Sequence, residues 1–299
     1  MERRHANAVI GVSSHFTGFA VDALSINAFP QSPDTLAAPA APTPLRAPGL
    51  WMALGWITFY FVLQAVGGSL IAIALAVATG FVPSWQALAH VGHLVEAALA
   101  QPGMQALMAM LTLGLAASVI LLLTRRRWPR LWSLARPPGF GVVRPAQIGF
   151  LLLAVAIGLT APLLGGWLTN WLAHGHPVTQ NVEQLGENTP LAWRIPLVLM
   201  VLSLGPLVEE LLFRGVLLSA LLQRWGTAAA VLLSSLVFAL AHLPGLGWQA
   251  FALPDLLLLA LALAWLRLRS GSIWPSVVAH GANNLLAVAA WFVATHPGA

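Results

Sequence analysis

Residues 206–223 read PLVEELLFRGVLLSALLQ, an apolar run interrupted by two adjacent carboxylates, Glu209 and Glu210, and by Arg214. A charged side chain at the centre of a bilayer costs at least ~2.5 kcal/mol on insertion scales, so such residues usually face a cavity or a partner. The stretch therefore predicts a transmembrane helix that also carries a site.

The composition of the whole chain indicates a membrane protein. Of its 299 residues, 59% are hydrophobic and only 8% are charged, whereas a soluble domain carries about 25% charged residues. There is no cysteine, which excludes disulfides, thiolate metal sites and cysteine nucleophiles. The net charge of +5 comes from arginines that lie between apolar segments. Membrane topology explains them better than nucleic acid does, so no nucleic-acid partner is expected.

Two regions differ in composition. Residues 1–48 include a Pro- and Ala-rich segment, which predicts a disordered amino-terminal tail. Residues 49–299 contain apolar segments long enough to cross ~30 Å of hydrocarbon, which predicts an all-α transmembrane helix bundle. We expect seven spans, at residues 50–82, 104–124, 147–173, 195–222, 227–242, 248–266 and 273–295. Gly205 and Pro206 could divide the fourth into two half-helices, which would add an eighth or re-entrant segment.

The distribution of arginines predicts the orientation of these spans. If every span crosses once, only Arg194 lies on the opposite side from the other arginines between the spans, which are Arg46, Arg125, Arg126, Arg127, Arg130, Arg136, Arg144, Arg224, Arg267 and Arg269. Loops rich in arginine stay on the cytoplasmic side. We therefore expect a multi-pass protein of the cell (inner) membrane with a cytoplasmic amino terminus and cytoplasmic Arg-rich loops.

Helix geometry separates the two carboxylates. Glu210 precedes Arg214 by four residues, which places both on one helix face in the favourable order for an ion pair. Glu209 lies ~100° around the helix and is the freer carboxylate. The alternative is that both acids belong to one buried salt-bridge network with Arg214.

Two further apolar segments carry polar residues at helical spacing. FALAH places Phe238 and His242 on one helix face, and HGANN does the same for His280 and Asn284. At 1.5 Å per residue, Glu209, His242 and Asn284 lie roughly 22, 24 and 20 Å from the cytoplasmic ends of their segments. These groups can therefore meet at one level. Asp255, near the start of the sixth segment, is expected to lie at the interface or to cap a helix, and the alternative is a contact with substrate.

These residue types suit hydrolysis by an activated water. Glu209 can act as general base while a neutral His242 holds the water, and His280 and Asn284 can donate hydrogen bonds to an oxyanion. Alternatively, Glu209, His242 and His280 supply the ligands of a catalytic Zn site with water in the fourth position. The sequence fits both arrangements.

The same stretches resemble a known family. EELLFRG, FALAH and LRSGSIWPSVVAHGANN are similar to the three motifs EExxxR, FxxxH and HxxxN of the CPBP family, the CAAX prenyl protease and bacteriocin-processing intramembrane endopeptidases. The resemblance covers about residues 195–299. It implies catalytic roles for Glu209, His242, His280 and Asn284, with structural support from Glu210, Arg214 and Phe238.

The family resemblance also implies an architecture and partners. Members form a bundle of transmembrane helices around a cavity within the membrane, and they act on membrane-associated proteins or peptides in contact with lipid. Members have been described both as metalloproteases and as metal-free glutamate-dependent enzymes, so the resemblance leaves the role of Zn open. The alternative function is a non-proteolytic relative: a membrane scaffold, a bacteriocin-immunity factor or a transporter.

Overall fold

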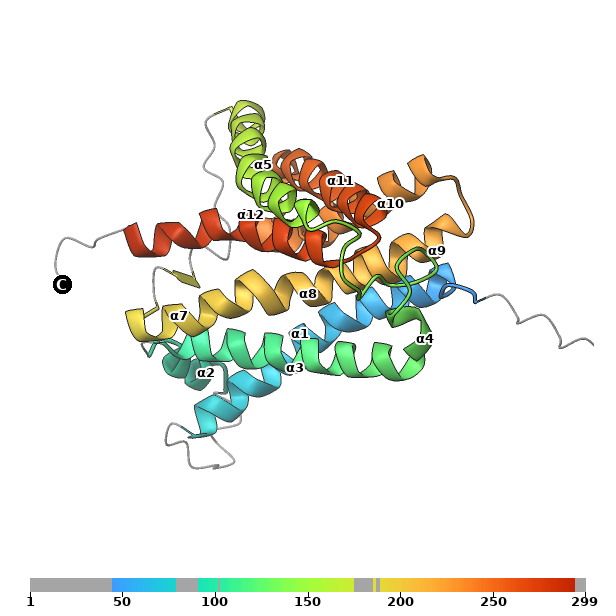
Figure 1. Cartoon of the computed structure of the whole chain (residues 1–299). Helices are drawn as coiled ribbons and strands as arrows, with labels where there is room; N and C mark the ends of the chain where they lie inside the picture. The colour runs from blue at the N-terminus through green and yellow to red at the C-terminus, as the bar shows by residue number, and fades with distance from the viewer. Residues whose placement is uncertain (1–44, 79–90, 102, 175–184, 187–188, 294–299) are drawn as a thin grey trace, which may run out of the picture. The chain divides into compact units, whose positions relative to one another are not determined.

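The computed structural model describes residues 45–78, 91–101, 103–174, 185–186 and 189–293. Within these ranges the chain is helical and contains no β-strand, which confirms the predicted all-α class (Figure 1). Most of the predicted tail, residues 1–48, lies outside the described residues.

The long helices follow the predicted apolar segments closely. They are α1 (Leu50–Ala78), α3 (Met104–Arg127), α5 (Gly149–Ala173), a continuous helical stretch over Leu191–Leu222, α10 (Thr227–Ala241), α11 (Leu253–Ser270) and α12 (Trp274–Val293). Shorter helices are α2 (Val91–Leu99), α4 (Pro129–Trp132), η4 (Leu243–Leu246) and η5 (Ala250–Ala252). The sequence therefore predicted the elements to within a few residues.

The predicted number of spans is not confirmed. Among the described residues, five helical stretches are long and apolar enough to cross a membrane: those that comprise α1, α3, α5, Leu191–Leu222 and Ala250–Ser270. The apolar helix α10 has 15 residues and rises only ~22 Å, which is less than the ~30 Å thickness of the hydrocarbon. Helix α12 is not among the five.

Gly205 and Pro206 do not divide the fourth segment. The chain stays helical through α7 (Leu191–Leu199), the π-helix η2 (Met200–Leu204), α8 (Gly205–Glu210), the π-helix η3 (Leu211–Leu217) and α9 (Leu218–Leu222). Pro206 has no backbone N–H and would break the hydrogen-bond ladder of a regular α-helix. The π-helical turn directly before it widens the helix there instead. The expectation of two half-helices was wrong.

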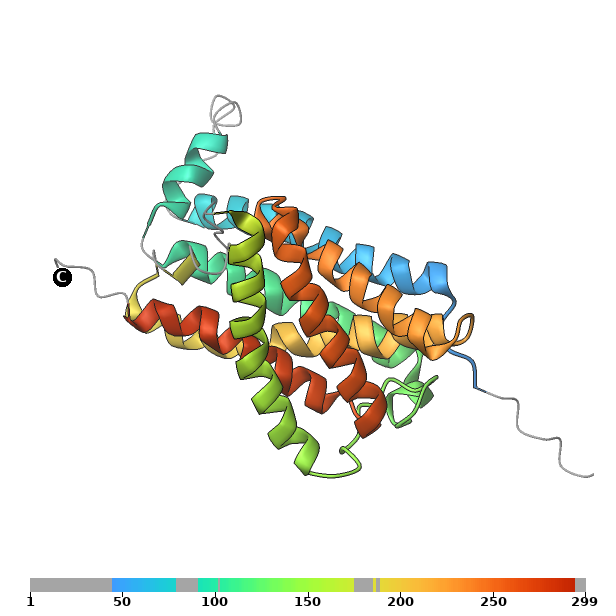
Figure 2. The same cartoon turned by 90° about the horizontal axis from the view of Figure 1, so that it is seen from above.

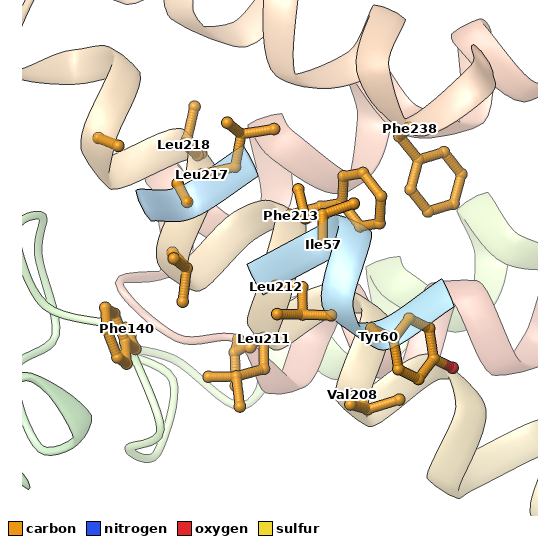
Figure 3. Packing of buried hydrophobic residues seen from close by; sticks show 14 of the residues in the cluster. Ile57, Tyr60, Phe140, Val208, Leu211, Leu212, Phe213, Leu217, Leu218 and Phe238 are labelled. Carbon is orange, nitrogen blue, oxygen red and sulfur yellow. The ribbon is translucent and has the colours of Figure 1, made fainter. Parts of the chain in front are cut away.

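The carboxyl-terminal half of the helical stretch Leu191–Leu222 belongs to the main hydrophobic core. Leu211 and Phe213 from η3 are buried against Ile57 and Tyr60 of α1, and Phe140 from the α4–α5 loop belongs to the same cluster (Figure 3). Helix α3 packs beside both α1 and α7. The charged part of the 206–223 stretch is thus surrounded by protein, as an intramembrane charge requires.

Helix α5 crosses α12 and packs beside α11 (Figure 2). Both contacts are close because a glycine of α5 lies at each of them. A Cβ at Gly158 would collide with the carbonyl oxygen of Ala279 in α12, and a Cβ at Gly165 would collide with the Asp255 carboxylate of α11. Small residues at helix crossings let transmembrane backbones approach one another in this way.

One arginine of the predicted cytoplasmic set is not an exposed charge. Arg267 is fully buried, and its guanidinium donates hydrogen bonds of 2.7 Å each to the carbonyl oxygens of Ala135 and Gly139 in the α4–α5 loop. Gly141 leaves room for this guanidinium, since a Cβ there would lie 2.5 Å from Arg267 Cζ. Arg267 therefore anchors a loop to α11 instead of facing the membrane surface.

Candidate active site

Three helical segments bring the predicted site residues together. Glu209 lies near the end of α8, His242 directly follows α10, and His280 lies in α12. Glu209 Oε2 is 3.4 Å from His242 Nε2 and 3.8 Å from His280 Nε2. The three polar groups thus meet at one level, as their depths in the sequence predict.

The two adjacent carboxylates have different environments. Glu210 is completely buried, and its Oε1 lies 3.0 Å from Arg214 Nη1, so the predicted ion pair is present. Glu209 retains 18% exposure of its side chain and has no arginine within ion-pair distance among the described residues. Of the two adjacent carboxylates, Glu209 is therefore the one that a substrate or water can reach.

Glu210 also contacts His280, an interaction that the sequence analysis missed. Glu210 Oε1 lies 3.1 Å from His280 Nδ1. A carboxylate paired with Arg214 can only accept, so Nδ1 carries the proton and donates it. This contact fixes the ring and directs Nε2 toward Glu209. Helical periodicity could not reveal it, because it joins two helices 70 residues apart in the sequence.

A backbone contact orients His242 in the same manner. Its Nδ1 lies 2.8 Å from the carbonyl oxygen of Phe238, one turn earlier in α10. A carbonyl oxygen only accepts, so Nδ1–H is the donor and the lone pair of a neutral ring is on Nε2. Nε2 and the Glu209 carboxylate then face each other as two acceptors. A water molecule or a shared proton between them satisfies both groups.

The Phe238 ring packs against both histidines. Its centroid lies 4.4 Å from that of His242 and 5.6 Å from that of His280. The Arg214 guanidinium carbon lies 4.3 Å from the same ring, within the range of a cation–π contact. Phe238 therefore contacts both imidazoles and the buried Arg214 guanidinium, and its supporting role in the site stays a prediction.

Asn284 of α12 is held in place by a hydrogen bond to the π-helix η2. Its Nδ2 donates a hydrogen bond of 3.1 Å to the carbonyl oxygen of Val201. The backbones approach closely there, because a Cβ at Gly281 would collide with the carbonyl oxygen of Leu202. Pro206, five residues after Val201, has no backbone N–H that could donate to the Val201 carbonyl oxygen. An amide nitrogen carries two N–H groups, so Asn284 retains one donor for a ligand.

Two cavities meet at Glu209. The first has a volume of about 360 Å³ and is lined by Tyr60, Gln64, Glu209 and Asn284 among others. The second, of about 680 Å³, has His242 and His280 on its wall and shares Gln64, Glu209 and Asn284 with the first. Glu209 and Asn284 can thus be reached from both cavities.

Comparison with known proteins finds a family model that matches part of the chain. Residues 191–286 match the model described as type II CAAX prenyl endopeptidase Rce1-like. Over these residues the chain is similar to that family. The match contains Glu209, His242, His280 and Asn284, and it confirms the resemblance to the CPBP family that the three motifs indicate. No curated protein and no solved structure matches the chain.

The matching model describes a family of prenyl endopeptidases, which are proteases, that is, hydrolases. The apolar helices of the described residues indicate a multi-pass membrane protein. The matched region does not include α1. Tyr60 and Gln64, which line the first cavity, therefore lie outside both the family match and the predicted site.

The predicted ligand set of Glu209, His242 and His280 is gathered at one place, with Glu209 Oε2 3.4 Å from His242 Nε2 and 3.8 Å from His280 Nε2. Within the described ranges no group of three His, Cys, Asp or Glu side chains stands out as a metal site. A role for Zn therefore stays a prediction.

Proposed function

We propose that this chain is a CAAX-protease-like intramembrane endopeptidase that hydrolyses peptide bonds of membrane-associated proteins or peptides through a glutamate-activated water. The observation that carries the proposal is the pair of Glu209 Oε2 and His242 Nε2, 3.4 Å apart on the wall of the second cavity. Both groups are acceptors in their resting states, and a water molecule donates one hydrogen to each. Such a water is held and deprotonated at the same place.

The reaction follows from the donors and acceptors around this water. The water oxygen attacks the peptide carbonyl carbon while Glu209 takes its proton. The resulting oxyanion accepts a hydrogen bond from the Asn284 N–H that is not bonded to Val201. Glu209 then returns the proton to the leaving nitrogen as the C–N bond breaks, which gives one new carboxyl and one new amino terminus. Water is the only other reactant.

His280 is the second oxyanion donor in this proposal. Because its Nδ1–H donates to Glu210, donation from Nε2 as well requires the imidazolium form, which carries both ring protons. Glu210 Oε1 lies 3.1 Å from Nδ1 and Glu209 Oε2 lies 3.8 Å from Nε2, so each ring nitrogen of that form faces a carboxylate.

The proposed mechanism uses no metal ion. The Asn284 amide has a role in it that a zinc site would not require. Metal analysis of purified, active protein tests the choice: we expect no stoichiometric zinc and full activity after treatment with a chelator. One equivalent of tightly held zinc, with activity that is lost on chelation and returns with zinc, would overturn the metal-free mechanism.

A cleavage assay tests the peptidase function against a scaffold, immunity or transport function. The purified chain is reconstituted into liposomes with a peptide library, and products are identified by mass spectrometry. We expect the wild type to generate new termini and Glu209→Ala to generate none. Comparison of peptides that accumulate in membranes lacking the protein would then identify the natural substrate. A folded wild type that cleaves nothing while it retains a partner or transports an ion would favour the non-proteolytic alternatives.

A further inference from the structure

A second carboxylate lines the second cavity besides Glu209. Asp255 lies in the first turn of α11, is partly buried and faces the same cavity as Glu209, His242 and His280. In the described part of the chain it has no hydrogen bond or ion pair. Its oxygens instead lie against the backbone of α5, where Gly165 leaves the space that any Cβ would fill.

The charge of this cavity is unbalanced. Its wall carries the carboxylates of Glu209 and Asp255, and no arginine of the described ranges lines it. Arg214, the nearest cation by sequence to Glu209, is fully buried and is held by Glu210 and by the carbonyl oxygen of Ala260 at 3.1 Å. Even with His280 in the imidazolium form and His242 neutral, two carboxylates face one positive charge, so the cavity is anionic. An unpaired carboxylate inside a membrane is costly, and such residues usually mark the path of a substrate or an ion.

We propose that Asp255 is a specificity-determining residue that binds a Lys or Arg side chain of the peptide substrate. The proposal rests on the peptidase function proposed above, because Glu209 then fixes where the substrate backbone lies. Asp255 and Glu209 line one cavity, and an extended peptide advances only ~3.5 Å per residue. The basic residue is thus expected within a few positions of the cleaved bond.

Asp255 also has a simpler explanation. A carboxylate in the first turn of a helix interacts favourably with the partial positive charge of the helix amino terminus. That interaction explains an acidic residue at the start of α11, where the sequence predicts an interface or capping residue. If this were the whole role of Asp255, the rate of cleavage would not depend on the charge of a substrate side chain, so substrates of different charge distinguish the two explanations.

The experiment uses the full chain in liposomes and pairs of peptides that differ only by Arg or its uncharged analogue citrulline at one position. For the wild type we expect a preference for Arg of roughly tenfold or more in kcat/KM at one position near the cleaved bond, in line with the strength of a hydrogen bond between charged groups. Asp255→Asn, which keeps the shape and removes the charge, should reduce the Arg/citrulline ratio to about one. Glu96→Gln is the matched control, because Glu96 is an exposed carboxylate of α2, and it should keep the wild-type ratio.

Binding separates this inference from the peptidase function. The same peptide pairs are titrated onto Glu209→Gln, with and without Asp255→Asn, and fluorescence anisotropy reports binding. Asp255-dependent preference for Arg without cleavage by the wild type would support the subsite and contradict the peptidase. Cleavage with equal kcat/KM for Arg and citrulline peptides at every position would support the peptidase and overturn the subsite.

A second peptide pair requires no variant. A peptide with Glu at the position of the basic residue should bind roughly tenfold more weakly than the same peptide with Gln, because Asp255 repels it. Equal binding of the Glu and Gln peptides to the wild type would contradict the proposal even if Asp255→Asn failed to fold.

Discussion

Glu209 and Glu210 are adjacent residues with the same carboxylate chemistry, but their surroundings differ. Glu210 lies in complete burial between Arg214 Nη1 at 3.0 Å and His280 Nδ1 at 3.1 Å. Among the described residues, the groups within ion-pair distance of Glu209 are nitrogens of His242 and His280, and Glu209 lines two cavities. A buried ion pair contributes little net stability but is costly to break. Glu210 is therefore suited to hold the site and Glu209 to react.

Asn284→Ala tests the oxyanion contact at the same scale. We expect kcat to fall about 10² to 10³-fold, the usual loss for one oxyanion donor, while KM changes little. The measurement is steady-state cleavage of one reporter peptide identified in the library. Asn283→Ala is the comparison. Asn283 lines the second cavity and donates a hydrogen bond of 3.5 Å to Asn284 Oδ1, but it has no contact with the oxyanion in the proposed mechanism, so its loss of kcat should be much smaller than that of Asn284→Ala. A near wild-type rate for Asn284→Ala would remove Asn284 from the mechanism.

The sequence could predict contacts within one helix but not those between helices. The Glu210–Arg214 pair and the shared faces of Phe238 with His242 follow from helical spacing alone. The Glu210–His280 contact and the cavity position of Asp255 depend on how α8, α11 and α12 pack, which no single-helix pattern contains. Arg267 shows the same limit: its position at a helix end predicts a surface charge, whereas the α4–α5 loop folds over it.

The stretch Leu191–Leu222 shows how one element positions these residues. Its two π-helical turns lie on either side of α8, which carries both carboxylates. Side chains of neighbouring helices bind backbone carbonyls of each turn: Asn284 donates to Val201 in η2, and Ser234 donates to Phe213 in η3 at 3.1 Å. A π-turn often occurs at a functional site. The sequence predicted an irregularity at Gly205-Pro206 but not its form, because propensity does not distinguish a break from a widened turn.

Gly158→Ala tests the helix crossing that closes the site from the α5 side. A Cβ there would collide with the backbone of Ala279, one residue before His280. Overpacking of this kind typically costs ~1–3 kcal/mol. We expect a lower thermal unfolding temperature in detergent and lower cleavage activity.

Gly149→Ala is the matched control in the same helix. Nothing lies within 4 Å of a Cβ at that position, and alanine favours a helix over glycine by up to ~1 kcal/mol. Its unfolding temperature should be unchanged or higher. Equal effects of the two substitutions would contradict the close packing of α5 on α12.

Across the described part of the chain, hydropathy predicts segment positions better than membrane crossings. The predicted fourth segment, 195–222, corresponds to Leu191–Leu222, and the fifth, 227–242, to α10. Burial of a helix in protein produces the same apolar composition as contact with lipid, so composition alone does not tell whether a helix such as α10 spans the bilayer. The span count and the orientation therefore stay predictions.

Cysteine labelling tests the orientation on a chain that has no native cysteine. Arg130→Cys and Arg224→Cys place exposed thiols in two of the predicted cytoplasmic loops, and Leu191→Cys places one at the other end of the helix that ends at Leu222. An impermeant maleimide added to intact cells should label only Leu191→Cys. Labelling of Arg224→Cys from outside, or of all three positions from one side, would contradict the proposed topology.

In the proposed mechanism Glu209 reacts and Glu210 supports the site, and the turnover of two amide variants distinguishes these roles. Cleavage rate per folded molecule is measured for Glu209→Gln and Glu210→Gln in liposomes, with thermal unfolding of both in detergent. Glu209→Gln should fold like the wild type and show no turnover, because it keeps the shape and loses the base. Glu210→Gln should be destabilised by roughly 3–5 kcal/mol, since Arg214 is then buried without its partner. Full turnover of Glu209→Gln together with a stable but inactive Glu210→Gln would contradict the account.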